Sequence, residues 1–354
     1  MKIDEYIEFL IKALPLGMRT MAVGKPGVGK TFGDMEACRR LEWDFIGLCA
    51  PLEDPSTIRG YPVPPKEAGG EATHCLFDGI AKAMRSIKPT RLLFDDLGMA
   101  SDSTKRAIIR LVQFGELDGR KLPDHVVIGA ATNDVGQGAD VFGMLEPLKS
   151  RFHTIITVET DLDAVISHGL SKEWPGCLLA YLRNANGSGD CALHDWKPSK
   201  SMHIDGACPR GWEYVAKWVN AGIDNQEVIA GCVGKGRATQ YLAFRALQND
   251  LPDVDAVLLD PEHSPVPENP SAQYLVTMAL AGRMDGGNFG QCVKYFRRMP
   301  AMFRALGIRD GLRAESKRRV AGTLPKGHQS ISASVDWTSF AVSEDGRAIM
   351  GAHS

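Results

Sequence analysis

The 354-residue sequence lacks any apolar run of the roughly eighteen residues that a membrane-spanning helix needs. Its eight cysteines form no Cys-x-x-Cys pair, which favours a reducing cytoplasm over a disulfide framework. Its formal net charge of −2 lacks the basic excess typical of proteins whose main task is to grip nucleic acid. We therefore expect a cytoplasmic globular protein, with neither a membrane nor a nucleic acid as its main partner.

The N-terminal stretch also lacks the net positive n-region of a signal peptide, because acidic residues Asp4 and Glu5 follow Lys2 there. Ile3, Tyr6, Ile7, Leu10 and Leu14 recur at helical spacing. This pattern predicts an amphipathic helix that packs on the first domain.

A standard zinc motif is missing as well. Cys191 with His194, and His203 with Cys208, form two close pairs of zinc-competent residues. The order Cys-His-His-Cys is not that of a standard finger or knuckle, although the ligand chemistry is suitable. We predict no stoichiometric zinc, with a metal site as the alternative interpretation.

What the sequence does contain is a phosphate-binding pattern, GKPGVGKT. It consists of Gly24, Lys25, Pro26, Gly27, Val28, Gly29, Lys30 and Thr31. The glycines allow backbone amides to approach phosphate oxygens, Lys30 would reach the β- and γ-phosphates, and Thr31 would hold Mg²⁺. The short apolar run before the pattern and the helical stretch after it are the context that such a loop requires.

Two carboxylates follow the apolar run Leu92 to Phe94. In a nucleotidase, Asp95 at the end of this strand would bind the Mg²⁺ that Thr31 holds, and Asp96 would orient or deprotonate the attacking water. Without the loop at Gly24, an acidic turn would be the simpler interpretation. With the loop, the pair predicts catalysis.

Three further polar residues stand where phosphate contacts are expected. Asn133 follows the apolar run Val126 to Ile128, and ligands of parallel α/β sheets sit at the carboxyl ends of strands. Arg151 lies in Ser-Arg-Phe before a fourth β-rich run, and its guanidinium is suited to steady γ-phosphate charge. Arg210 follows Pro209 at a predicted helix start, where the helix dipole disfavours a cation and a phosphate would favour one.

Taken together, these motifs occur in the order of an AAA+ ATPase, and their detail resembles the MoxR branch. The supporting stretches are PLEDPSTIRGYPVP, LLFDDLGMAS, AATNDVG, EPLKSRF and CPRGWEYV, within about residues 1–250. The resemblance implies an αβα domain with a five-stranded parallel sheet, a small helical lid and a ring of subunits with nucleotide between them.

The resemblance also implies roles for single residues. Lys30 and Thr31 match the Walker A pair, and Asp95 and Asp96 match Walker B. By the same comparison, Asn133 corresponds to sensor 1, Arg151 to the arginine finger and Arg210 to sensor 2. The usual second Walker B acid is glutamate, so Asp96 leaves the positioning of water and the turnover rate open, but not nucleotide binding.

We expect an ATPase core over residues 1–160, a lid over 161–250 that is interrupted at NANGSGD, and a mostly helical extension over 251–354 that ends in a possible hairpin. The alternation in ISASVDWTSFAV predicts the first strand of that hairpin, and Asp345-Gly346 its turn. The insertion GYPVPPKEAGGEATH is rich in Pro and Gly and predicts a loop or a short hairpin. A second insertion, FGELDGRKLPDH, contains Asp118-Gly119 and predicts a hairpin. In a ring, Tyr61 would be a candidate contact with the pore or a partner.

The expected activity is Mg-ATP hydrolysis in an oligomeric ring, expected to be hexameric, that remodels or activates a protein partner. Relatives of this type commonly act with a von Willebrand factor A domain protein.

Two alternative functions stay open. One is a motor acting on nucleic acid, such as a helicase loader, supported only by the basic stretch from Arg297 to Arg319. The other is a nucleotide-gated scaffold with weak hydrolysis, which Asp96 suggests.

Overall fold

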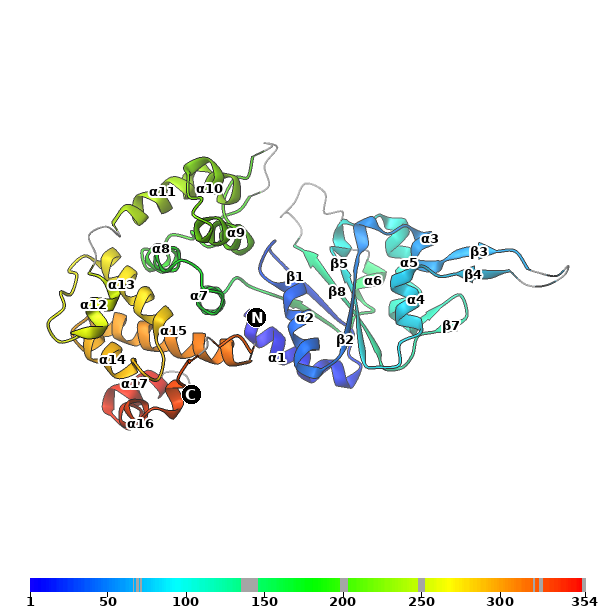
Figure 1. The fold of residues 1–354 in the computed structure, drawn as a ribbon. Helices are drawn as coiled ribbons and strands as arrows, with labels where there is room; N and C mark the ends of the chain where they lie inside the picture. Colours follow the sequence, from blue (N-terminus) through cyan, green and yellow to red (C-terminus); the bar gives the residue numbers. More distant parts are fainter. Residues whose placement is uncertain are drawn as a thin grey trace. The chain divides into compact units, whose positions relative to one another are not determined.

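The computed structural model describes residues 1–65, 67, 70, 72–134, 146–197, 203–247, 252–320, 322–324 and 327–351. The chain divides into two compact units, Met1–Asp161 and Leu162–Ser354, and each is described by itself (Figure 1). Among the described residues, no helix is long and apolar enough to cross a membrane.

A five-stranded parallel sheet forms the centre of the first unit. In spatial order its strands are β2 (Asp44–Cys49), β5 (Thr90–Asp95), β8 (Val126–Asn133), β1 (Thr20–Gly24) and β9 (Thr154–Thr157). Leu92 to Phe94 and Val126 to Ile128 are buried, as expected of parallel strands that are covered on both faces. Gly24 pairs with Asn133 in this register, so the loop after β1 begins beside the end of β8. The predicted parallel sheet is thereby confirmed.

Helices flank this sheet. In Figure 1, α1 (Ile3–Ala13) and α2 (Lys30–Leu41) lie on one side, and α4 (Asp78–Met84) and α5 (Asp102–Phe114) lie on the other. The shorter helical elements are η1 (Leu14–Leu16), η2 (Ala50–Leu52), α3 (Pro55–Arg59), η3 (Leu97–Met99) and α6 (Glu146–Lys149). The predicted N-terminal helix is confirmed: it buries Ile3, Tyr6, Ile7 and Leu10, and the Tyr6 ring fills the space above Gly33 of α2.

Both insertions form short antiparallel hairpins. The first pairs β3 (Tyr61–Val63) with β4 (Thr73–Cys75), and the second pairs β6 (Glu116–Leu117) with β7 (Arg120–Lys121). Asp118 and Gly119 both have positive φ, +47° and +79°, which is the backbone of a two-residue hairpin turn. Arg59 pairs with Asp118 at 2.7 Å, so the base of the first hairpin is tied to the tip of the second.

The second unit is helical. Its helices are α7 (Leu162–Ser171), α8 (Gly176–Gly187), α9 (Pro209–Asn220), α10 (Gln226–Val233), α11 (Lys235–Ala246), α12 (Val254–Leu259), α13 (Pro270–Arg283), α14 (Phe289–Arg297), α15 (Ala301–Val320), η5 (Ile331–Ala333), α16 (Val335–Ala341) and α17 (Glu344–Gly351). One buried hydrophobic cluster runs through it, from Ile166 on α7 to Phe340 on α16. The helical C-terminal region that the resemblance implies is present.

The C-terminal hairpin and the interruption at NANGSGD were wrong predictions. Residues 331–351 form η5, α16 and α17, and Ser334 caps α16, its Oγ accepting a hydrogen bond from the Trp337 amide at 3.1 Å. Helical spacing then brings Trp337 and Phe340 against the ring of Phe289, with centroids 5.7 and 5.6 Å away. Likewise, NANG is the last turn of α8.

Candidate functional site

The predicted phosphate loop joins β1 to α2. Gly27 and Gly29 have positive φ, +75° and +99°, a region that other residues rarely adopt, and Gly29 is the N-cap of α2. A Cβ atom on Gly24 would lie 2.3 Å from the carbonyl oxygen of Val158. Each of the three glycines therefore has a backbone reason to be glycine, and α2 directs its first amides toward the mouth of the loop.

Lys30 is buried and crosses this loop. Its Nζ donates hydrogen bonds to the carbonyl oxygens of Gly24 at 2.9 Å and Lys25 at 3.0 Å, and to Oδ1 of Asn133 at 3.0 Å. Asn133 is the last residue of β8, the strand beside β1. The structure thus brings the predicted phosphate cation and the predicted sensor residue into direct contact.

Thr31 and Asp95 form the second contact between the loop and the sheet. Thr31 Oγ1 donates a hydrogen bond to Asp95 Oδ2 at 2.8 Å, and the other carboxylate oxygen accepts from the Asp96 amide at 3.0 Å. A hydroxyl and a carboxylate at this distance are hard oxygen donors of the kind that Mg²⁺ takes beside phosphate. These two residues therefore fit the predicted magnesium site.

Asp96 is half-buried and has a left-handed backbone, with φ of +51° and ψ of +35°. This conformation is uncommon for a residue with a side chain, and such residues cluster at functional sites. It also separates the two acids, since Asp95 ends β5 and Asp96 precedes the turn of η3. The arrangement suits two carboxylates with different roles.

Arg151 lies elsewhere on the first unit. Its Nε donates to Oε1 of Gln113 at 2.9 Å, and its guanidinium also contacts the carbonyl oxygen of Pro147. Both contacts hold it near the C-terminal end of α5 rather than at Lys30. These contacts do not bring Arg151 to the phosphate loop of its own chain. The role of Arg151 stays a prediction.

Arg210 belongs to the second unit and is described apart from the loop. It is exposed in the first turn of α9, directly after Pro209. Among the described residues, no hydrogen bond or ion pair holds its guanidinium. It thus stands, as the sequence predicts, near a helix N-terminus that disfavours a cation.

A buried network beneath α2 was missed by the sequence analysis. Arg91 Nε donates to Asp34 Oδ1 at 2.8 Å, and Nη2 donates to Thr20 Oγ1 at 2.6 Å. Tyr6 donates to the other Asp34 oxygen at 2.8 Å, and all four side chains are buried. Burial raises the pKa of Asp34 while Arg91 lowers it. The network fixes α2 against β1 and β5, and a charged residue inside an apolar strand is the only signal that pointed to it.

The structure does not show the candidate zinc residues gathered into a metal site among the described residues. Cys191 is exposed, Cys208 is half-buried and His194 is buried. Among the described residues, no group of three or more His, Cys, Asp or Glu could hold a metal ion. The absence of zinc remains a prediction, which elemental analysis of the purified protein tests.

No family model matches the chain, and no curated protein matches it. Among solved structures, RuvB of Thermotoga maritima, a Holliday junction branch migration motor, is 12% identical, with a TM-score of 0.35, over 77% of this chain and 80% of that chain. NtrX from Brucella abortus is 12% identical with a TM-score of 0.37, over 88% of this chain and 67% of that chain. At such scores these likenesses decide neither family nor function.

Proposed function

We propose that this chain is an AAA+ ATPase of the MoxR type, which hydrolyses Mg-ATP in a homo-oligomeric ring, expected to be hexameric, to remodel or activate a protein partner. The observation that supports it most is the joining of three motifs at one edge of the sheet. Lys30 contacts Asn133, and Thr31 contacts Asp95, within hydrogen-bond distance. These are the groups that nucleotide phosphates and their metal ion require.

Each residue is assigned a role. Lys30 and the amides of Gly27 to Lys30 bind the phosphates, Thr31 and Asp95 hold Mg²⁺, and Asp96 orients the attacking water. Asn133 fixes Lys30 and the γ-phosphate, while Arg210 steadies the same charge. Held by Thr31 and Asp95, Mg²⁺ would neutralise phosphate charge. Arg151 acts on the nucleotide of a neighbouring subunit, which is consistent with its place away from its own loop.

The partner is proposed to be a protein, with a von Willebrand factor A domain protein as the candidate. The exposed side chain of Tyr61 on the first hairpin is the proposed contact; its ring centroid lies 5.7 Å from that of Phe77, in a tilted arrangement. A basic C-terminal face for nucleic acid is less favoured, because ion pairs neutralise much of it. Arg309 and Arg313 pair with Asp163, Arg304 with Asp345 and Arg319 with Glu315.

The test is phosphate release from ATP with and without Mg²⁺, in wild type, Asp96→Asn and Asp78→Asn. We expect Asp96→Asn to keep ATP binding and to lower kcat by about 10² to 10⁴, the range for lost general acid or base catalysis. Asp78 is an exposed carboxylate on α4, so its amide variant controls for loss of charge alone. If the wild type binds no ATP by calorimetry, or Asp96→Asn turns over as fast as wild type, the proposal is wrong. Wild type that binds ATP without releasing phosphate would instead favour the scaffold.

A further inference from the structure

One aspartate, Asp195, bonds the residues that follow α8 to the residue that precedes the N-cap of α9. The amides of Asp195 and Trp196 donate to the carbonyl oxygen of Ala207, at 3.1 and 2.9 Å, and Asp195 Oδ1 accepts from the Ala207 amide at 2.6 Å. Ala207 is fully buried and directly precedes Cys208, the N-cap of α9. Asp195 therefore fixes the backbone at the point from which α9 starts.

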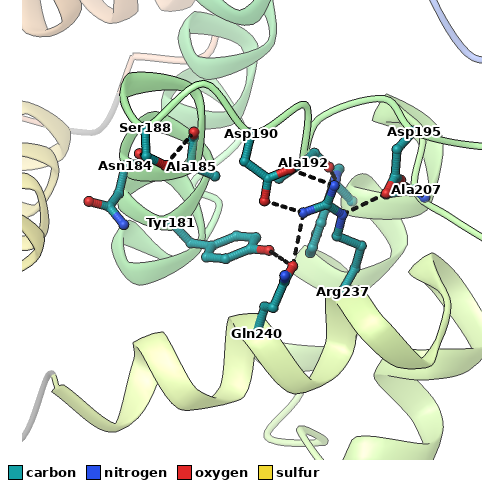
Figure 2. A network of polar contacts seen from close by, with 11 residues as sticks. Tyr181, Asn184, Ala185, Ser188, Asp190, Ala192, Asp195, Ala207, Arg237 and Gln240 are labelled. Carbon is teal, nitrogen blue, oxygen red and sulfur yellow. Dashed lines mark hydrogen bonds and ion pairs between the residues drawn. The ribbon is translucent and has the colours of Figure 1, made fainter.

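Arg237 of α11 holds that aspartate in turn. Its Nε donates to Asp195 Oδ2 at 2.7 Å, its Nη2 to Asp190 Oδ1 at 2.8 Å and its Nη1 to Gln240 Oε1 at 2.9 Å. Figure 2 shows the guanidinium between the two carboxylates, with Gln240 below it and the Tyr181 hydroxyl directed at Gln240. The side chain of Arg237 is only 11% exposed. A planar guanidinium can make these bonds at once, whereas a lysine ammonium is a single point charge.

The start of α9 has little room to move. A Cβ atom on Gly206 would lie 2.7 Å from the carbonyl oxygen of Asp195, and one on Gly211 would lie 2.5 Å from that of Cys232. A Cβ atom on Gly234, between α10 and α11, would lie 2.8 Å from the amide nitrogen of Gly206. Close backbone packing and the ion pair of Arg237 with Asp195 therefore both fix the position of the first turn of α9.

This first turn carries Arg210, whose own side chain has no hydrogen bond among the described residues. Its position therefore depends on the α9 backbone. We propose that Arg237 is a positioning residue for Arg210, setting the start of α9 through Asp195 so that Arg210 meets the nucleotide phosphates. This inference rests on the proposed function, in which Arg210 steadies phosphate charge.

The experiment compares the KM for ATP and kcat in Arg210→Ala, Arg237→Lys and the double variant. Each is measured at a temperature below its own thermal unfolding midpoint. We expect Arg237→Lys to shift the same kinetic constant as Arg210→Ala, by about ten-fold, the effect of losing one hydrogen bond to a charged group. The double variant should be no worse than Arg210→Ala, because a displaced start of α9 costs nothing further once Arg210 is gone.

Arg245→Lys is the matched control. Arg245 lies on the same helix and pairs with Asp224, but it does not touch the segment that precedes α9. We expect it to leave KM and kcat within about two-fold of wild type, as for a partly exposed pair. Should Arg237→Lys fail to fold, Asp195→Asn keeps the shape of the side chain, removes its charge and should shift the same constant by a smaller factor.

The outcomes separate this inference from the function on which it rests. Unchanged kinetics in Arg237→Lys, or losses that add to those of Arg210→Ala, would overturn the inference and leave a purely structural ion pair. If Arg210→Ala is silent while Asp96→Asn loses activity, the role of Arg210 and this inference both fail, but the ATPase proposal stands. If neither variant changes activity, the proposed function itself fails.

Discussion

The edge of the sheet at the loop of the first unit and the helical second unit place their charged groups differently. In the first, Lys30, Thr31, Asp95 and Asn133 meet at the carboxyl ends of three strands, and all but Lys30 are only half-buried. In the second, charges pair deep between helices. Arg183 on α8 is 7% exposed and binds both oxygens of Asp310 on α15, which is 1% exposed.

This difference indicates different roles. A polar group at the edge of a sheet can exchange its present hydrogen bonds for those of a phosphate or a metal ion. A buried pair has lost its water on both sides, so removing one partner leaves an uncompensated buried charge. Changes at the sheet edge should therefore affect ligand binding more than stability. Changes to buried pairs, such as Arg183 with Asp310 in the second unit or Arg91 with Asp34 in the first, should do the reverse.

The largest stability effect is expected for Arg183→Met. Asp310 would lose both hydrogen bonds from Arg183 and keep only the longer contact with Arg309, at 3.6 Å, which costs up to about 3–5 kcal/mol in the free energy of unfolding. ATP affinity at low temperature should stay within about two-fold of wild type, because the hydrogen bonds and ion pairs described for this pair are made to residues of the second unit. Urea unfolding and calorimetry give the two values.

A second variant removes both charges of this pair, as Arg183→Met with Asp310→Leu. It should recover part of the lost stability, since no buried charge then remains unpaired. A single variant as stable as wild type would contradict the structural role of the pair.

Lys30→Ala is expected to act in the opposite way. ATP affinity should fall by about 100-fold or more, because the cation for the β- and γ-phosphates is removed. The free energy of unfolding should change by less than in Arg183→Met, since the hydrogen bonds shown for Lys30 go to neutral acceptors, none of which is left as an unpaired charge. Lys12→Ala, at an exposed lysine of α1, is the control and should bind ATP normally. Equal ATP affinity in Lys30→Ala and wild type would contradict the assignment of ligand binding to the sheet edge.

The smallest effect concerns pH. Burial alone would raise the pKa of Asp163, but Arg183, with Arg309 and Arg313, lowers it to about 2. Because this lies below the unfolded value near 3.9, the carboxylate stabilises the fold above about pH 4, and that contribution, on the order of 2 kcal/mol, is lost as the pH falls toward 2. Urea unfolding between pH 6 and pH 2.5 should show a weaker pH dependence in Asp163→Asn. An identical dependence would show that Asp163 does not titrate as proposed.

What the sequence could predict follows the same division. The loop, Asp95 and Asn133 were predictable because each lies at the end of an apolar run, and the ends of parallel strands meet at one edge. Arg91 with Asp34 was not, because its partners come from three elements and no local spacing links them. The ion pairs of Arg183 and Arg237 join residues up to 127 positions apart, which no motif records.

The C-terminal prediction failed for a local reason. Alternation over Ile331 to Trp337 indicated a strand. However, the hydroxyl of Ser334 caps a helix, and the helix brings the ring of Trp337 against that of Phe289. A capping residue within an alternating stretch was the signal that the pattern alone did not weigh.

The central claim is that ATP bound at Gly24 to Thr31 is hydrolysed with the help of Arg151 from a neighbouring subunit. Mixing Arg151→Ala with Lys30→Ala tests it most directly, because the first keeps an intact loop and the second an intact arginine. Each variant alone should be nearly inactive. In a random 1:1 mixture, about one neighbouring pair in four joins an intact loop to an intact Arg151, so about a quarter of wild-type activity should return. If mixed oligomers form and no activity returns, Arg151 does not act across a subunit boundary and the account is contradicted.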